Sequence, residues 1–228
     1  EVTNEEPITG DITLPNTTEV KRRITDTFAA QNRAVTKNDY RAIVYAMPGE
    51  FGAIKKCHVI RDVDSFKRNL NMYLISENTD GTLIPTNSVI KENLKTWLNR
   101  YKMINDTVDI LDAKIVNLGI DFEILTAQES NKFETLNAAL RALRRAYENH
   151  YEISEPFSIA EIYRVLNTVP GVADTLNVRV YKKAGGVYAS NRFNVTANLT
   201  PQGRQILAPE NVIFEVKFPN ADIKGTVV

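Results

Sequence analysis

Two stretches of this chain follow one plan, in which an amphipathic helix is stopped by Pro-Gly just before a strand. The first runs from Asp39 to Gly49 and the second from Ile159 to Gly171. Each Pro-Gly pair predicts a sharp helix end, because proline cannot continue a helix and glycine adopts the backbone angles that turn the chain. The plan predicts an α+β chain, built either by duplication of one helix-strand unit or by chance use of a common helix ending.

Composition and charge restrict the class of protein. The 228 residues are 43% hydrophobic and 25% charged, which is typical of a folded chain with one large or two small domains. Lys plus Arg equals Asp plus Glu, 28 against 28, so no overall field would hold the protein on nucleic acid or an anionic membrane. We therefore expect neither partner.

The metal-binding and redox residues are few. Cys57 is the single cysteine and there are two histidines, which excludes an internal disulfide and a clustered structural zinc site. This usage favours a reducing compartment. No stretch approaches the roughly 18 to 20 apolar residues that cross a bilayer, and we expect no metal or cofactor.

The helical and strand patterns divide the chain into four segments, with candidate boundaries near 105–107 and 153–157. Together they predict mixed, mostly antiparallel small sheets packed with helices. The segments are 1–34, an extended arm and first helix; 35–105, a first α+β unit; 106–155, central strands and a long helix; and 156–228, a C-terminal α+β unit with a long loop.

Local signals in the first half predict particular elements. A helix over 19–34 carries one modest apolar face that includes Val20, Ile24 and Phe28. Thr36 and Asp39 form a capping-box pattern for the next helix. Strand 51–61 is expected to pair with 70–76 as a hairpin, and a helix capped by Thr86 should run to about residue 102 with Trp97 in the core.

The middle of the chain predicts two strands and a long helix. Stretches 108–116 and 119–125 alternate polar and apolar residues, and we expect them to share a sheet. The helix over 131–151 should face Phe133 and Leu136 inward. The same periodicity places three arginines outward, as a basic ridge for solvent or a subunit contact: Arg141, Arg144 and Arg145.

No catalytic constellation stands out. Cys57 and His58 would point to opposite faces of a strand, and His150 lies far away in sequence, so a structural cysteine is the favoured interpretation. Four carboxylates on the predicted strands could form an acid-base pair or a cation site, but their alternation with Ile and Leu favours a solvated face. They are Asp109, Asp112, Asp121 and Glu123.

The long segment over 182–208, rich in glycine and asparagine, is the best candidate for a binding surface. It carries Tyr188, Arg192 and Phe193, residue types that are favoured in the centres of protein interfaces. The alternative is a flexible hairpin tip.

The order of several motifs resembles the baseplate J-like family of contractile phage tails. The motifs are Val35 to Tyr40 leading into Ala46 to Gly49, the turn from Val169 to Asp174, and the strands from Ile110 to Ile124. Within that family the order is most similar to the wedge subunits of T-even phages. The resemblance covers most of 35–218.

The resemblance implies the C-terminal part of a wedge subunit that assembles with other wedge proteins and its own copies into a ring around the tail hub. Such a subunit is structural and non-enzymatic, rearranges on sheath contraction, and belongs to the virion after assembly in the host cytoplasm. An open alternative is a receptor- or glycan-binding module that uses the 182–208 segment.

Overall fold

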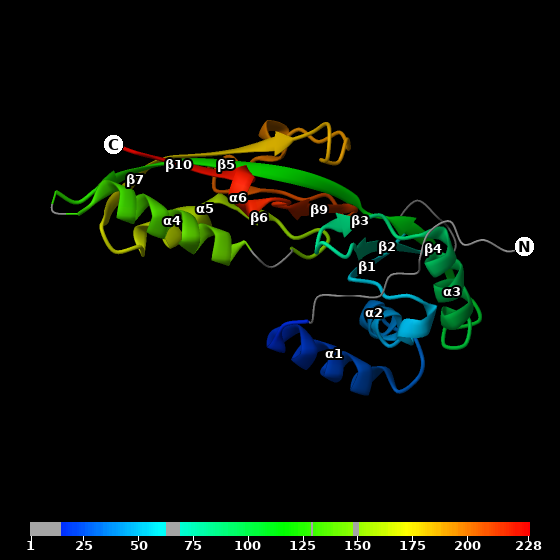
Figure 1. Cartoon of the computed structure of the whole chain (residues 1–228). Coiled ribbons are helices and arrows are strands. Elements are labelled where there is room, and N and C mark those ends of the chain that lie inside the picture. The colour runs from blue at the N-terminus through cyan, green and yellow to red at the C-terminus, as the bar shows by residue number, and fades with distance from the viewer. Residues whose placement is uncertain (1–14, 63–68, 129, 148–150) are drawn as a thin grey trace, which may run out of the picture. The chain divides into compact units, whose positions relative to one another are not determined.

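The computed structural model describes residues 15–62, 69–128, 130–147 and 151–228. The chain forms two compact units, the first ending at Ala113 and the second beginning at Lys114 (Figure 1). Each combines helices with small mixed sheets, which confirms the α+β class. The expected segment 106–155 spans this division.

The first unit is organised around one strand. β2 (Asn69–Glu77) pairs antiparallel with β1 (Lys56–Arg61) and β3 (Leu83–Ile84), and parallel with β4 (Thr107–Asp112). The pairing of β1 with β2 confirms the expected hairpin. The helical elements of this unit are α1 (Thr17–Ala30), α2 (Lys37–Tyr45), the 3-10 turn η1 (Gly49–Phe51) and α3 (Ser88–Leu98).

The capping box of α2 is present. The amide of Asp39 donates to the Thr36 hydroxyl, and the Asp39 carboxylate accepts from the Thr36 amide at 2.8 Å. With its first turn satisfied in this way, α2 buries Tyr40 and Ile43 in the core of the unit. The Tyr40 hydroxyl donates to Asp106.

The helix expected from Thr86 to residue 102 is shorter than predicted. Its cap is Asn87, whose side chain accepts from the Val89 amide at 2.9 Å. Leu94 is buried, but Val89 on the expected apolar stripe is exposed. Trp97 was expected in the core but is only partly buried at its border, where its indole N–H donates to the Ile43 carbonyl at 2.9 Å.

The second unit is built on β5 (Lys114–Thr126), which pairs antiparallel with β7 (Val172–Lys183). On its other side β5 pairs parallel with β9 (Val212–Glu215) and then with β10 (Ile223–Val227). The remaining elements are α4 (Lys132–Ala146), β6 (Phe157–Ser158), α5 (Ile159–Asn167), the 3-10 turn η2 (Thr196–Asn198), β8 (Gln205–Ile206) and the short helix α6 (Pro219–Asp222).

The two strands expected at 108–116 and 119–125 do not share a sheet. β4 joins β2 in the first unit, whereas β5 is one continuous strand of the second unit. Gly119, where the second of these strands was expected to begin, lies inside β5. A Cβ atom there would lie 2.7 Å from Tyr181 Cζ, so the glycine permits close approach of that ring.

Aromatic rings fill the core of the second unit. Tyr147 stacks on Phe157 with ring centroids 5.4 Å apart, and Tyr151 lies against the same ring at 5.3 Å. Ala139 and Leu143 of α4 are buried beside them. Phe133 was expected in this core but is 80% exposed, because it lies in the first turn of α4 beyond the edge of the packed face.

Both helix-Pro-Gly-strand stretches exist, with different endings. In the second, β7 begins directly after Gly171, whose φ is +90°. In the first, Pro48 leads into η1 and Gly52, which has φ +101°, before β1 begins at Lys56. Both strands then pair antiparallel with the central strand of their unit, β1 with β2 and β7 with β5. The shared pairing fits duplication of one unit, and the different endings fit chance use of a common helix ending.

We expect Gly52→Ala to lower the free energy of unfolding by roughly 1 to 3 kcal/mol. Its backbone lies in a region that glycine alone adopts readily, and a Cβ would come within 2.7 Å of Ile90 Cγ1. Gly49→Ala, in the same turn, meets nothing within 4 Å and should leave stability nearly unchanged. Urea denaturation of both variants tests this, and equal losses would contradict it.

Burial raises the pKa of Tyr147 and of Tyr151 well above the ordinary value of 10.0. Both tyrosines are neutral in either state below pH 10, so their stabilising contribution is fully present there. Above pH 10 the unfolded chain ionises first, and stability falls by up to about 1.4 kcal/mol per pH unit for each group. The double variant Tyr147→Phe/Tyr151→Phe should therefore lose less unfolding free energy than the wild type between pH 8 and 11, measured by urea denaturation at each pH. An equal loss in the two proteins would show that these tyrosines do not cause the pH dependence.

Candidate assembly surface

Helix α1 has an ordinary local origin. Asn16 accepts a hydrogen bond from the Glu19 amide at 2.8 Å and so caps the first turn. The helix ends where Gln31 adopts a left-handed conformation with φ 46°. Its apolar residues recur every four positions, which places Val20, Ile24 and Phe28 in one stripe along the helix.

The charged face of α1 faces α2 and β1. Glu19 Oε1 lies 2.8 Å from Arg23 Nη2 and 3.5 Å from Lys56 Nζ, and these three side chains are mostly shielded from solvent. Arg41 Nη2 of α2 lies 3.1 Å from Asp26 Oδ2. The Glu19–Arg23 pair lies within α1, whereas the contacts to Lys56 and Arg41 join α1 to β1 and α2 through charges.

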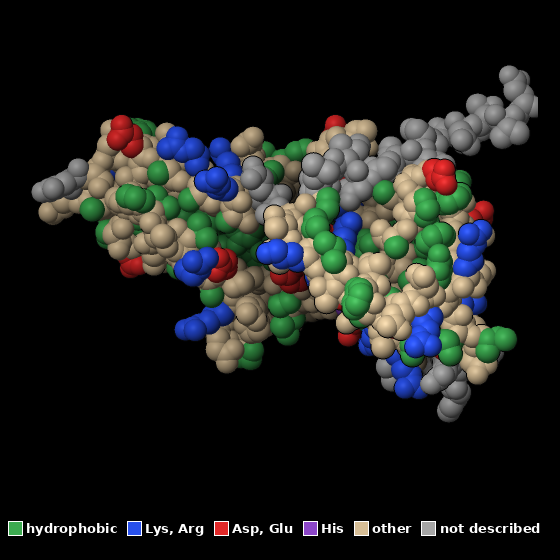
Figure 2. All heavy atoms as spheres, turned by 90° about the horizontal axis from the view of Figure 1, so that it is seen from below, with side chains coloured by type: hydrophobic (Ala, Val, Ile, Leu, Met, Phe, Trp, Pro, Cys, Tyr) green, Lys and Arg blue, Asp and Glu red, His purple; other side chains and the backbone are tan. Residues whose placement is uncertain are grey.

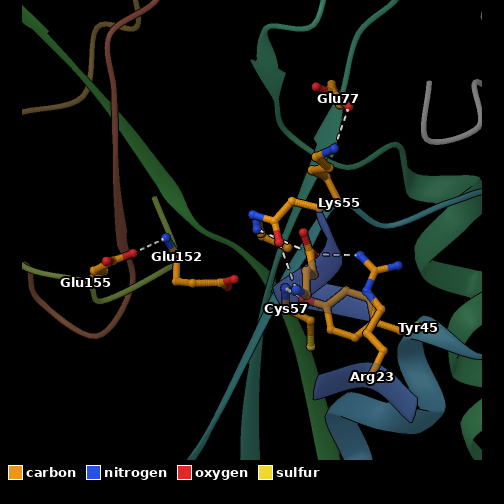
Figure 3. Close-up of polar contacts among 10 residues, drawn as sticks. Arg23, Tyr45, Lys55, Cys57, Glu77, Glu152 and Glu155 are labelled. Carbon is orange, nitrogen blue, oxygen red and sulfur yellow. Dashed lines mark hydrogen bonds and ion pairs between the residues drawn. The ribbon is translucent and has the colours of Figure 1, made fainter. Parts of the chain in front are cut away.

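An arginine–tyrosine contact supports the same docking. The Arg23 guanidinium carbon lies 4.2 Å from the centroid of the Tyr45 ring, within the range of a cation–π contact (Figure 3). Tyr45 Oη in turn accepts from the Cys57 amide at 3.0 Å. These contacts therefore hold α1 against both α2 and β1.

The apolar stripe of α1 consequently points to solvent. Ile24 is 64% exposed and Phe28 83% exposed, and Val20 is also exposed. Figure 2 views the molecule from the side on which α1 lies in Figure 1, and hydrophobic side chains reach the surface there. An aligned set of exposed apolar side chains is typical of a protein-protein contact. We name Val20, Ile24 and Phe28 the α1 stripe.

The residues predicted in the 182–208 segment lie in two environments. Tyr188 Oη donates to Asp222 Oδ1 at 2.7 Å, and the Tyr188 ring packs edge-on against Phe218. Phe193 packs edge-on against Phe214, with ring centroids 5.4 Å apart. Arg192 is exposed. Two of the three side chains thus stabilise their own unit, and their role in an interface stays a prediction.

Asp222 organises this region. It is completely buried, and its carboxylate accepts from Lys183 Nζ at 2.5 Å and from the Phe218 amide at 2.8 Å. The hydrogen bond to Asp222, with partial burial, raises the pKa of Tyr188. Partial burial opposes the charge on Lys183, but its hydrogen bonds and charge interactions with Asp222 and Tyr188 together outweigh that effect and raise its pKa. Sequence reasoning missed Asp222, since one aspartate after Pro-Asn-Ala carries no motif.

The three arginines of α4 differ in exposure. Arg141 and Arg145 are exposed, whereas Arg144 is half-buried, so they do not form one uniform ridge. Among the described residues, no hydrogen bond or ion pair connects them to Tyr188, Arg192 or Phe193. The structure therefore offers no single patch made from both sets.

The catalytic alternatives gain no geometric support. Cys57 is 2% exposed on β1, and His58 follows it on the same strand; His150 lies outside the described residues. Asp109 and Asp112 belong to the first unit, whereas Asp121 and Glu123 belong to the second. Within the ranges described, no group of three or more His, Cys, Asp or Glu side chains could hold a metal ion.

The sequence predicts the periodicity of the α1 stripe but not that the stripe faces solvent. The signal that could have revealed it is the density of charge on the opposite face, where Glu19, Arg23 and Asp26 are spaced to meet partners. Of the helices in the described ranges, none is long and apolar enough to span a membrane.

Known proteins resemble this chain in fold rather than in sequence. No family model matches the chain, and no curated protein matches it. The fold is similar to that of a chain in the cryo-EM structure of the six-fold symmetrised baseplate of the anti-feeding prophage, with a TM-score of 0.53 and 11% sequence identity. The similarity covers 88% of this chain and 41% of that one, so the chain spans less than half the length of its structural neighbour. At this identity, what the two proteins share is a fold.

Proposed function

We propose that this chain is a non-enzymatic structural subunit of the baseplate of a contractile phage tail or tail-like particle. The observation that carries the proposal is the fold similarity to a baseplate chain over 88% of the residues. The more specific role is that of a wedge protein, which contacts neighbouring wedge proteins and its own copies in a ring and rearranges on contraction.

The α1 stripe supports an assembly role independently of that similarity. A subunit that works alone gains nothing from exposing aligned apolar side chains, because their contact with water is unfavourable at about 25 cal/mol per Å2. In a ring, every subunit would cover such a surface with its neighbour. We therefore assign the α1 stripe to a contact with another baseplate subunit.

The proposal predicts that Phe28→Ser lowers incorporation of the chain into particles at least about fivefold, the effect of losing roughly 1 kcal/mol of contact energy. The measurement co-expresses the chain with the other structural genes of the phage or particle from which it comes and quantifies it in purified particles. Stability of the free chain should change by less than about 0.5 kcal/mol, since Phe28 is exposed.

Phe133→Ser is the matched control, because Phe133 is an equally exposed phenylalanine on a helix but has no stripe around it. Incorporation at the wild-type level is expected for this variant. An equal loss for both variants would remove the α1 stripe from the proposal, and absence of the wild-type chain from the particles would overturn the proposed function itself.

A second pair of variants tests the interface predicted in the 182–208 segment. Tyr188→Phe removes the hydrogen bond to the buried Asp222 and should cost about 1.5 kcal/mol of stability. Arg192→Ala should cost less than about 0.5 kcal/mol, because the side chain is exposed, yet should reduce incorporation if this segment contacts a subunit. Normal incorporation of Arg192→Ala would contradict that assignment.

A further inference from the structure

The outer edge of β4 has three features that the rest of the fold does not explain. Its backbone groups are unpaired by any described strand, a groove runs along it, and it carries an exposed apolar side chain beside a carboxylate. β4 lies at the edge of the first unit's sheet and pairs in parallel with β2 over Thr107 to Asp112. No other strand of the described residues pairs with it. Edge strands offer unpaired N–H and C=O groups on which another strand can add.

The direction of these backbone groups follows from one hydrogen bond. The Ala113 amide donates to the Leu74 carbonyl at 3.1 Å, so Ala113 faces β2. In a regular parallel ladder, alternate residues direct both backbone groups to the same side. The register of β4 with β2 is unbroken, so Val108 and Ile110 direct their N–H and C=O groups away from β2.

A groove of about 380 Å3 lies along this edge. One wall is α3, and the floor is β4 itself, from Val108 to Leu111. Four consecutive residues line it, so both faces of the strand meet the groove, as expected of a strand's edge. The residues that α3 contributes are Lys91, Glu92 and Lys95.

The side chains indicate what would fit. Leu111 is 40% exposed, which offers an apolar contact to a side chain on a neighbouring strand. Asp112 is neutralised by Lys91, whose Nζ lies 2.6 Å from its carboxylate. Asp109 accepts from the neutral Asn69 amide at 2.7 Å, which leaves its negative charge uncompensated by that contact.

Charge decides between a second copy and a different chain. Pairing β4 with another β4 would bring two Asp109 and two Asp112 side chains onto one short two-strand ribbon, and like charges on paired strands are destabilising. A strand that places Lys or Arg beside Asp109 and an apolar residue beside Leu111 satisfies both positions.

We propose that the outer edge of β4 receives an extended strand from a different protein of the baseplate, with apolar and basic residues on the face shared with Leu111 and Asp109. This inference rests on the proposed function, because it takes the partner from the same particle. The strand would add to the sheet through the outward groups of Val108 and Ile110 and lie in the groove beside α3.

Hydrogen-deuterium exchange resolved to single amides tests this in the free chain and in purified particles. The amides of Val108 and Ile110 should exchange at least about tenfold more slowly in particles than in the free chain. The amides of Asp109 and Leu111, which face β2, act as internal references and should be protected in both samples. Fast exchange at Val108 and Ile110 in particles would overturn the inference.

The same comparison separates this inference from the proposed function. Absence of the chain from particles would refute the proposed function, whereas presence without protection at Val108 and Ile110 would refute only the added strand. Protection that appears in the free chain at high concentration would identify a second copy as the occupant and overturn the choice of a different protein.

A charge variant adds an independent readout. Asp109→Lys should reduce incorporation at least about fivefold, since it places a cation beside the expected basic residue. Asp80→Lys makes the same charge change at an exposed turn of the same unit and should incorporate normally. Equal incorporation of the two variants would contradict the charge assignment.

Discussion

One central strand in each unit holds the other principal strands. β2 carries β1 and β3 on antiparallel ladders and β4 on a parallel one. β5 carries β7 on an antiparallel ladder and β9 and β10 on parallel ones. Because backbone groups buried without partners are costly, these two strands must be paired on both sides, and the unpaired groups are left to the strands at the edges. The edge of β4 that we assign to a partner follows from this arrangement.

Helix α1 inverts the usual relation between pattern and burial. Its charges face the unit, where Glu19 meets Lys56 and Asp26 meets Arg41, and its apolar stripe faces solvent. Partly shielded ion pairs contribute little net stability, since desolvation offsets much of their attraction. The ion pairs matter for orientation rather than for stability. They hold α1 so that the stripe faces outward, where a neighbouring subunit can cover it.

The 182–208 segment shows how a long loop can be structural. Its glycines and asparagines predict mobility, yet Tyr188 and Phe193 are tied to the second unit by Asp222 and Phe214. Asp222 and Phe214 lie more than twenty residues further along the chain, and no local sequence motif predicts that they contact this segment. Only Arg192 of the predicted set is free of such packing and can report on an interface by itself.

The sequence alone determined the α+β class, the capping box at Thr36 and Asp39, and the hairpin of β1 and β2, because these depend on residues that are neighbours in the chain. Tertiary structure decided which sheet each strand joined and which face of a helix was covered. The alternation predicts two strands that break before Gly119, yet β5 runs through this residue and the Tyr181 ring fills the space above it. The apolar face of α1 is visible in the sequence, but only the charged contacts to α2 and β1 turn it towards solvent. Such outcomes depend on partners brought together only by folding, so periodicity alone cannot assign the buried face.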